Sequence, residues 1–370
     1  MNLQRECEIL LRHFGVPAVG IACVVPTGVE SLACLGERKQ GSGVAVTEYD
    51  LWHIGSCTKS MTATLLARYV ERGELEWDAP LAPLFTAYGF DVHPDFADLT
   101  LRHLLTHRSG MAADPSYSAV NACSDYTQEW QQRAAFTAAT LTEGPTQKPG
   151  DAFCYSNLGY IIAAALLETV TGTAWEELMR RELFAPLDLA SAGFGAPGKS
   201  SRGSFARPSG PAVLAQPWGH LPGTVNGIFT GLNPDDDAAD NPAWSGPAGA
   251  VHLSLPDYAR YVAFHLSRGA IAPGYLMPET VDALHAALPG EDSALGWFTS
   301  SAETSGVGKF AIWHEGTNNA WYAGMLFVPD DQRGLALVSN ACPDALLDPN
   351  SGMMTMVLED VFNRWPSPMA

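Results

Sequence analysis

Positive charge is scarce in this sequence of 370 residues. Lysine and arginine together number 21 and aspartate and glutamate 40, which gives a formal net charge of −19 at pH 7. A surface this acidic repels phosphate backbones and anionic lipid headgroups. We therefore expect neither nucleic acid nor a membrane surface among the partners of this protein.

Long hydrophobic runs are absent as well. No stretch approaches the ~20 consecutive apolar residues of a transmembrane helix, although 46% of the residues are hydrophobic. The stretch 1–20 mixes charged and apolar residues, which predicts an amphipathic surface helix and not the apolar segment of a signal peptide. The seven cysteines are an odd number without CxxC or zinc-type spacing, as suits a reducing compartment. A cytoplasmic location is predicted.

Two common catalytic signatures are missing. No serine has glycine both two residues before and two residues after it, which excludes the nucleophile elbow of the α/β-hydrolases. His103 and His107 stand four residues apart, as metal ligands can on a helix, but the glutamate of a zincin motif does not lie between them. We accordingly predict no metal ion and no other cofactor.

Strand-like patterns gather at the two ends of the chain. They are apolar and rich in β-branched residues, and they are separated by turn signals, which predicts an antiparallel sheet. Because single cores stop growing near ~250–300 residues, a chain of this length favours two lobes. The predicted strands are 17–25, 31–36, 310–316, 321–329 and 333–341.

The middle of the chain, 77–241, has a different sequence pattern, because prolines are frequent and helical patterns alternate with loops. We predict an α+β fold in which residues 1–76 and 242–370 form a lobe with the antiparallel sheet and flanking helices. Residues 77–241 are predicted to form a mostly helical lobe inserted into it. The helical patterns of this lobe are 101–107, 126–141, 158–172 and 175–187, and its predicted loops include 195–211 and the acidic run 235–237.

The stretch 51-LWHIGSCTKSMTATLLARYVERGEL-75 places Ser56 and Lys59 three residues apart at the start of a helix predicted for 56–71. Residues i and i+3 of a helix share one face, and a helix N-terminus favours a developing negative charge. A serine hydroxyl becomes a nucleophile when a base takes its proton, and burial can lower the pKa of a lysine enough for that task. A serine that merely caps the helix is the alternative interpretation.

Tyr155 and Asn157 precede a strongly apolar helical pattern. A phenol beside an ammonium group can become phenolate-like and act as a base. The Asn157 amide can hold the lysine or bind a substrate carbonyl. Helix capping and packing would explain the same pair without any chemistry.

A third candidate element lies at the end of a predicted strand, at His314, Gly316 and Thr317. Glycine lets a ligand approach the backbone closely. The backbone N–H groups of Ser56 and Thr317 would together form an oxyanion hole, whose donors are commonly worth on the order of 10²–10³ in rate each. An ordinary turn glycine at a strand end is the alternative.

The elements Ser56-Cys-Thr-Lys59, Tyr155-Ser-Asn157 and His314-Glu-Gly316 resemble, in order and spacing, the three motifs of the serine β-lactamase superfamily. That superfamily includes class C β-lactamases, penicillin-binding D,D-peptidases, D-aminopeptidases and family VIII carboxylesterases. Flanking stretches such as 101–111 and 247–266 are similar too, so the resemblance covers most of the chain.

The resemblance implies a two-lobe fold with the active site in the cleft between the lobes. It implies that Ser56 is the acylated nucleophile and that Lys59 and Tyr155 share the duties of general base and general acid. Asn157 and the strand from His314 through Gly316 to Thr317 would hold the substrate.

The third motif departs from the pattern. β-Lactamases and peptidases carry lysine where this chain has His314, which Glu315 follows. A charged lysine helps to bind a substrate carboxylate, whereas histidine is largely neutral near pH 7; the neighbouring glutamate could leave it partly charged. Esterase-type members often have His or Trp there, so we expect esters or amides without a required carboxylate.

The sequence therefore predicts a serine hydrolase that cleaves a small-molecule ester or amide through an acyl-enzyme on Ser56, closest in type to a family VIII carboxylesterase. D-Aminopeptidase or amidase, β-lactamase or D,D-peptidase, and acyltransferase activities are the alternatives within the family. A catalytically silent, ligand-binding member of the fold is the alternative from another class. The oligomeric state stays open.

Overall fold

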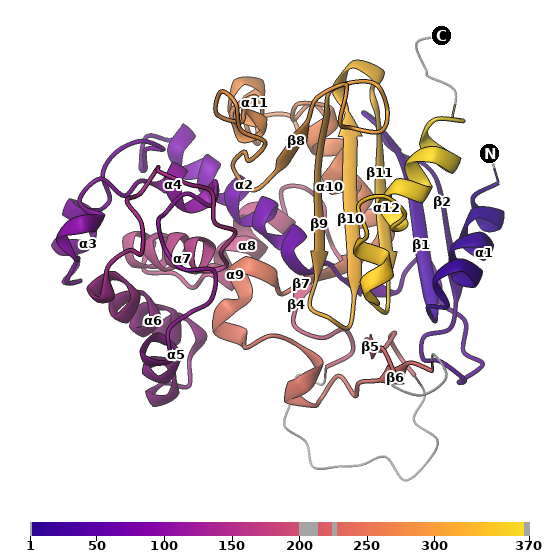
Figure 1. The fold of residues 1–370 in the computed structure, drawn as a ribbon, viewed down its shortest axis with the longest axis horizontal. Helices are drawn as coiled ribbons and strands as arrows, with labels where there is room; N and C mark the ends of the chain where they lie inside the picture. Colours follow the sequence, from indigo (N-terminus) through magenta and orange to yellow (C-terminus); the bar gives the residue numbers. More distant parts are fainter. Residues whose placement is uncertain (1, 200–213, 224–227, 366–370) are drawn as a thin grey trace.

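The computed structural model of the protein describes residues 2–199, 214–223 and 228–365. A six-stranded antiparallel sheet forms one side of the molecule and a group of helices the other (Figure 1). The α+β class predicted from the sequence is confirmed. The lobe boundaries at 76/77 and 241/242 stay a prediction.

The sheet joins the two ends of the chain in the order β2-β1-β11-β10-β9-β8. β1 pairs with β11, so the N-terminal hairpin is completed by strands that come almost 300 residues later in the sequence. The hairpin turn is tighter than predicted, because Val25 already pairs with Gly28. The strands are β1 (Ala18–Val25), β2 (Gly28–Gly36), β8 (Phe298–Ser300), β9 (Ala311–Thr317), β10 (Tyr322–Val328) and β11 (Arg333–Ser339).

Two smaller sheets lie beside the large one. The first has the order β3-β7-β4, and its strand β3 leads directly into the segment that carries Ser56. The second pairs β5 with β6. Their strands are β3 (Leu51–His53), β4 (Gly193–Phe194), β5 (His220–Leu221), β6 (Thr230–Gly231) and β7 (Val251–Ser254).

Helices cover both faces of the large sheet, which explains why β1 is apolar throughout and does not alternate. Ala18, Ala22 and Val24 of β1 belong to the core shared with α10 (Leu255–Leu266). Val19, Ile21 and Cys23 of β1 belong to a second core, against α1 (Leu3–Phe14), α12 (Met353–Val357) and the π-helical turn Leu358–Phe362.

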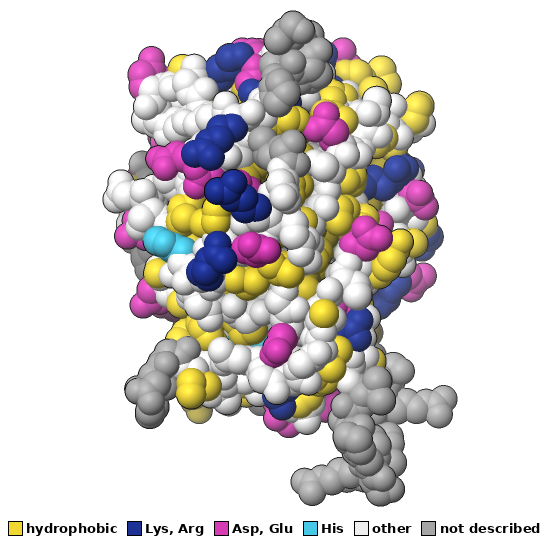
Figure 2. Space-filling view, turned by 90° about the vertical axis from the view of Figure 1, so that its right-hand side faces the viewer, with side chains coloured by type: hydrophobic (Ala, Val, Ile, Leu, Met, Phe, Trp, Pro, Cys, Tyr) yellow, Lys and Arg dark blue, Asp and Glu magenta, His cyan; other side chains and the backbone are white. Residues whose placement is uncertain are grey.

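The predicted amphipathic helix at the N-terminus is confirmed, because α1 buries one face at helical spacing: Leu3, Cys7, Leu10 and Phe14. Figure 2 looks onto the side of the molecule where α1 lies in Figure 1. On this face, basic and acidic side chains are interspersed among apolar ones, and neither sign gathers into a single large patch.

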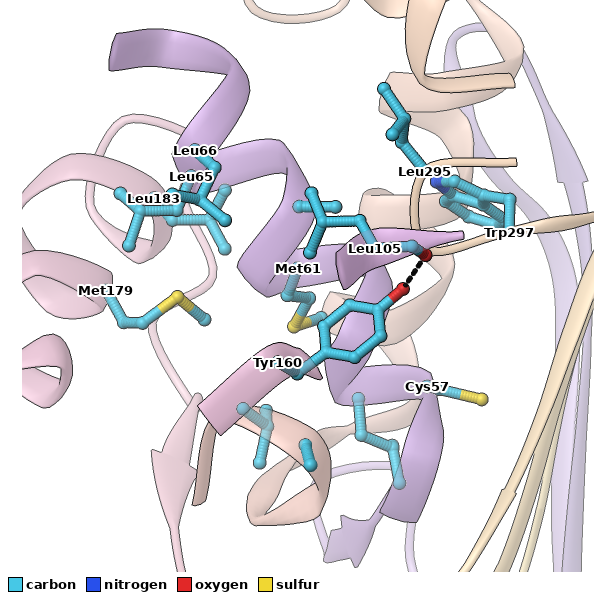
Figure 3. Close-up of a cluster of buried hydrophobic side chains, with 14 of the residues drawn as sticks. Cys57, Met61, Leu65, Leu66, Leu105, Tyr160, Met179, Leu183, Leu295 and Trp297 are labelled. Carbon is cyan, nitrogen blue, oxygen red and sulfur yellow. Dashed lines mark hydrogen bonds between the residues drawn. The ribbon is translucent and has the colours of Figure 1, made fainter. Parts of the chain in front are cut away.

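The helix α2 (Thr58–Glu71) runs through the centre of the molecule, and every residue from Thr58 to Ala67 is buried. Its first turn differs from the prediction, since Gly55–Cys57 form a 3-10 turn, η1. Figure 3 shows apolar side chains packed around α2. In this cluster the hydroxyl of Tyr160 donates to the backbone oxygen of Leu105 at 2.6 Å. Labelled members of this cluster are Cys57, Met61, Leu65, Leu66, Met179, Leu183, Leu295 and Trp297.

The predicted helices of the middle region are present with shifted ends. The pattern at 126–141 becomes a helix only at Glu129, and the one at 175–187 continues from Met179 as the π-helical turn Arg180–Phe184. The acidic run 235–237 is exposed, as predicted, whereas most of the predicted loop 195–211 lies outside the described residues. The remaining helices are α3 (Ala82–Ala87), α4 (Leu101–Leu105), α5 (Tyr117–Ala122), α6 (Glu129–Glu143), α7 (Leu158–Thr171), α8 (Trp175–Met179), α9 (Gly246–Gly249) and α11 (Pro278–His285).

Within the described ranges, no single helix has both the length and the hydropathy needed to cross a membrane. Only the pair Leu158–Thr171 and Trp175–Phe184 reaches these values when taken together, and the two helices meet at 85°.

Candidate active site

Backbone hydrogen bonds between β7 and the start of α2 fix the segment that carries Ser56. The N–H of Ile54 donates to the oxygen of Val251, and the N–H of Val251 donates to the Thr58 hydroxyl, both at 3.0 Å. Gly55 adopts a φ of 50°, a left-handed conformation that glycine accepts without strain. Ser56 is half-buried in the resulting turn, and no side-chain capping bond forms at the start of α2, so the capping interpretation is not supported.

Lys59 is 0% exposed, and its Nζ donates to three oxygens. They are Ser56 Oγ at 3.0 Å, Asn157 Oδ1 at 2.7 Å and the backbone oxygen of Ala248 at 2.8 Å. None of these oxygens carries a formal charge. Burial therefore lowers the pKa of Lys59 from 10.5 to about 7, against a small opposing effect of Cys57. A neutral amine within hydrogen-bond distance of the serine hydroxyl is what a general base requires.

Asn157 stands directly before α7 but forms no side-chain capping bond there. Its amide oxygen accepts from Lys59 instead. Of the two roles that the sequence allowed for this amide, the structure shows the one that holds the lysine. The Nδ2 group of Asn157 remains as a donor for a substrate carbonyl.

Tyr155 stands at the edge of the site, with 37% of the residue exposed. Lys59 Nζ lies 5.0 Å from the centroid of its ring. Burial of the phenol raises its pKa to about 12, although a hydrogen bond with Ser56 opposes this shift. The expectation of a phenolate-like base is therefore not supported, because the lysine lies over the ring and the hydroxyl keeps its proton. Tyr155 is placed to donate a proton.

Sequence reasoning missed the role of His107, which it considered only as a metal ligand. The imidazole is buried and stacks on Tyr155, with ring centroids 4.3 Å apart and planes at 26°. Its Nδ1 accepts from the N–H of Ser156 at 3.1 Å. Burial, with Lys59 and His314 nearby, holds the pKa of His107 well below its usual value. Among the described residues, no group of three His, Cys, Asp or Glu side chains could hold a metal ion.

β9 places His314 on the side of the site. The imidazole is buried, and its Nδ1 lies 2.6 Å from the backbone oxygen of Glu315, which assigns the ring proton to Nδ1. Nε2 is then an acceptor, and none of the described residues forms a hydrogen bond with it. Burial and the charge of Lys59 lower the pKa of His314 to about 3.

The Glu315 side chain points the other way, since successive side chains of a strand alternate between faces. Its carboxylate accepts from the Tyr322 hydroxyl at 2.5 Å. The glutamate therefore does not charge the histidine, and His314 is neutral near pH 7.

Two glycines let the third motif approach the serine turn. A β-carbon built on Gly316 would lie 2.7 Å from the backbone nitrogen of Ser56, and one built on Gly55 would lie 2.5 Å from that of Thr317. Real β-carbons do not come this close, so both positions require glycine. The two N–H groups predicted to form the oxyanion hole are therefore brought side by side, and their role stays a prediction.

Comparison with known proteins agrees with this arrangement. The sequence model of the Beta-lactamase family matches residues 13–349. The chain belongs to the Beta-lactamase family. It is a serine hydrolase, and the resemblance noted in the sequence is confirmed.

The relatives of this Beta-lactamase family member include proteins named as penicillin-binding proteins and as an esterase. Penicillin-binding protein 4 of Amycolatopsis lactamdurans is 26% identical over 98% of this chain and 88% of its own length. The esterase/β-lactamase LipL of Mycobacterium tuberculosis is 28% identical over 38% of this chain and 30% of its own. The octameric penicillin-binding protein homologue of Pyrococcus abyssi shares the fold, with a TM-score of 0.71, 20% identity, and coverage of 97% and 78%.

Proposed function

We propose that this serine hydrolase is a carboxylesterase that acts on a neutral small-molecule ester. The observation that carries the proposal is the state of His314, a buried neutral imidazole whose acceptor nitrogen has no partner among the described residues. An acceptor cannot bind a substrate carboxylate, which a charged lysine at this position would attract. The similarity to the esterase/β-lactamase LipL supports this choice.

Acylation follows from the contacts around Ser56. Lys59, as a neutral amine, takes the proton of the Ser56 hydroxyl while Oγ attacks the ester carbonyl. The negative charge that develops on the carbonyl oxygen is stabilised by the N–H groups of Ser56 and Thr317. When the C–O bond breaks, the leaving alkoxide takes a proton from the Tyr155 hydroxyl, and the Lys59 ammonium restores that proton.

Deacylation uses the same groups in reverse. Water attacks the acyl-enzyme, its proton passes to neutral Lys59, and the ester bond to Ser56 Oγ breaks. The proton returns to Oγ, which regenerates the free enzyme and releases a carboxylic acid. Asn157 keeps Lys59 in place through both steps.

Amide hydrolysis is the second candidate, and the state of Tyr155 favours it. An amine leaving group must be protonated as it departs, and a phenol that keeps its proton at neutral pH can supply it. The remaining expectations, a small-molecule substrate and a cytoplasmic location, stay predictions.

The test is hydrolysis of p-nitrophenyl butyrate at pH 7–8 by the wild type and by Ser56→Ala. We expect turnover by the wild type, labelling of Ser56 by a fluorophosphonate probe, and loss of both in the variant. Equal activity in the two proteins would contradict the proposed nucleophile.

The ester preference has its own control, His314→Lys. We expect the wild type to prefer a neutral ester over the same ester with a carboxylate on its acyl group. In the variant, the ratio of kcat/KM for the two esters should shift toward the ester that carries the carboxylate. A wild type that prefers the carboxylate would overturn the interpretation of His314.

A further inference from the structure

A buried carboxylate beside the site, Asp240, takes no part in the steps above. It lies before α9, and its side chain is 9% exposed. Burial opposes its charge, but His53, the Asn241 N–H and the Asn318 amide outweigh burial and lower its pKa. Asp240 is therefore an ionised carboxylate enclosed by protein, an arrangement that is costly unless its partners are well placed.

One partner of Asp240, His53, contacts the segment that carries Ser56. His53 is the last residue of β3 and is 0% exposed. Its Nδ1 accepts from the N–H of Gly55 at 3.1 Å, so the proton of the neutral ring lies on Nε2. That Nε2 lies 3.1 Å from Asp240 Oδ1, a contact within ion-pair distance but without the geometry of a full hydrogen bond. The carboxylate is thereby linked, through one imidazole, to the residue directly before the nucleophile.

The other partner of Asp240, Asn318, directly follows Thr317. Asn318 Nδ2 donates to the same oxygen, Asp240 Oδ1, at 3.2 Å. The amide oxygen of Asn318 accepts from the N–H of Ala320 at 3.3 Å, which fixes the orientation of the side chain in the turn after β9. The carboxylate is thereby linked to the residue directly after Thr317.

We infer that Asp240 is a positioning residue that holds the two oxyanion donors at a fixed separation. Its two links end at Gly55 and Asn318, each one residue away from a donor N–H, and both links converge on one oxygen atom. The inference rests on the proposed function, because it gives Ser56 and Thr317 the roles stated there. Donors held in advance of the reaction stabilise the transition state without reorganisation.

The two segments lie so close together that the separation of the Ser56 and Thr317 N–H groups depends on how tightly the segments are held. Gly55 and Gly316 are in contact with the opposite segment, so the segments can move apart but not closer together. A displacement of ~1 Å at a reacting centre can cost on the order of 10² in rate. Loss of the carboxylate that ties both segments should therefore appear in catalysis more than in substrate binding.

The experiment compares Asp240→Ala and Asp240→Asn with Asp236→Ala, a matched control at an exposed aspartate in the same segment. The substrate is p-nitrophenyl butyrate, and a boronic acid serves as the probe of the tetrahedral state. For Asp240→Ala we expect kcat to fall ~10–100-fold, less than the ~10²–10³ for outright loss of an oxyanion donor, while KM changes little. Binding of the boronic acid should weaken by a similar factor.

Two readouts separate positioning from a merely structural role. Asp240→Asn, which keeps an acceptor oxygen for His53, should recover part of the rate. The pH midpoint of activity should stay near that of the wild type, since Asp240 is not among the groups that shift the pKa of Lys59. The inference would be overturned if the fall in kcat came with an equal rise in KM. It would also be overturned if the affinity for the boronic acid stayed unchanged.

Failure of the inference can be told from failure of the proposed function. If Ser56 is not labelled by a fluorophosphonate and Ser56→Ala retains activity, the proposed function itself is wrong. If activity requires Ser56 but Asp240→Ala equals Asp236→Ala in kcat, only the positioning role is wrong. Should Asp240→Ala not fold, Asn318→Ala removes one link alone, and we expect a smaller loss of kcat in the same direction. Unchanged kcat in Asn318→Ala would then overturn the inference.

Discussion

Two cations in the described part of the chain are fully buried, and they differ in what surrounds them. Arg133, on α6, and Lys59, on α2, are both 0% exposed. Arg133 donates to two carboxylates, with Nη1 at 2.9 Å from Glu176 and Nε at 3.1 Å from Glu168. Lys59 donates to a hydroxyl, an amide oxygen and a backbone oxygen, none of which is charged.

The charge of the partners, and not the number of hydrogen bonds, separates the two groups. Burial opposes the charge of both cations. The carboxylates more than compensate at Arg133 and raise its pKa, whereas no carboxylate compensates at Lys59 and its pKa falls to about 7. A paired cation holds helices together, while an unpaired one is ready to exchange a proton at neutral pH.

The largest expected effect comes from Lys59→Arg. The guanidinium keeps its positive charge at all accessible pH values and cannot accept the Ser56 proton. We expect kcat to fall by on the order of 10²–10⁴, the usual contribution of a general base, with a folded protein. Retention of wild-type kcat would show that another group is the base.

Lys59→Met tests the cost of the unpaired charge. Like Lys59→Arg it should lose most of its activity, but it should be more stable than the wild type by about 0.5–2 kcal/mol at pH 7, because a buried cation without a carboxylate partner is removed. The unfolded state keeps its lysine proton up to the usual pKa of 10.5, so wild-type stability rises between about pH 7 and 10.5. The gain from Lys59→Met should therefore shrink over that window, as denaturant unfolding at several pH values can show.

Arg133→Met should have the opposite profile. It leaves Glu168 buried without its cation, and removal of one partner of a buried ion pair typically costs about 3–5 kcal/mol. We expect lower stability in denaturant unfolding but a kcat per folded molecule within about twofold of the wild type, since surface and structural changes away from the site act mainly on stability. A large loss of kcat in folded Arg133→Met would contradict the division between the two cations.

The pH dependence of kcat/KM gives a third comparison. The active form of the free enzyme has neutral Lys59, so kcat/KM should rise with pH, change tenfold per unit below the midpoint, and level off above about pH 7. No loss is expected at higher pH until the phenol of Tyr155 ionises near 12. Arg133→Met should show the same midpoint, and a displaced midpoint there would show that the two cations are coupled.

The smallest effect is expected for His107→Asn. Asparagine tolerates the left-handed backbone of this position, where φ is 59°, and it keeps an acceptor for the Ser156 N–H. Only the ring stacked on Tyr155 is lost. Because such aromatic pairs are worth about 0.5–1.5 kcal/mol, we expect kcat to fall about 2–10-fold. His107→Ala should lose more, because it also removes the acceptor for the Ser156 N–H. A wild-type kcat in His107→Asn would contradict a role for the stacked ring.

The sequence predicted those parts of the site that depend on local spacing. Ser56 and Lys59 face each other because they stand three residues apart at a helix start, and alternation along β9 places His314 on the side of the site. The sheet was predictable for the same reason, since turn signals and apolar runs are local.

What escaped prediction depends on contacts between distant segments. The backbone oxygen of Ala248, which completes the surroundings of Lys59, comes from 189 residues further along the chain. The stack of His107 on Tyr155 and the place of Asp240 between two segments are likewise properties of the packed chain. The sequence left the division of base duty between Lys59 and Tyr155 open, because the burial that raises the pKa of the Tyr155 phenol cannot be deduced from its neighbours in sequence.

Direct titration of Lys59 tests the central claim that an unpaired, buried ammonium group supplies the base. The chain has five lysines, so ¹³C-labelled lysine side chains can be followed by NMR, and Lys59→Arg identifies the signal that belongs to Lys59. We predict a titration midpoint near 7, well below the other four lysines. A midpoint near 10.5 would contradict the account, because Lys59 would then remain protonated at neutral pH and could not take the proton of Ser56.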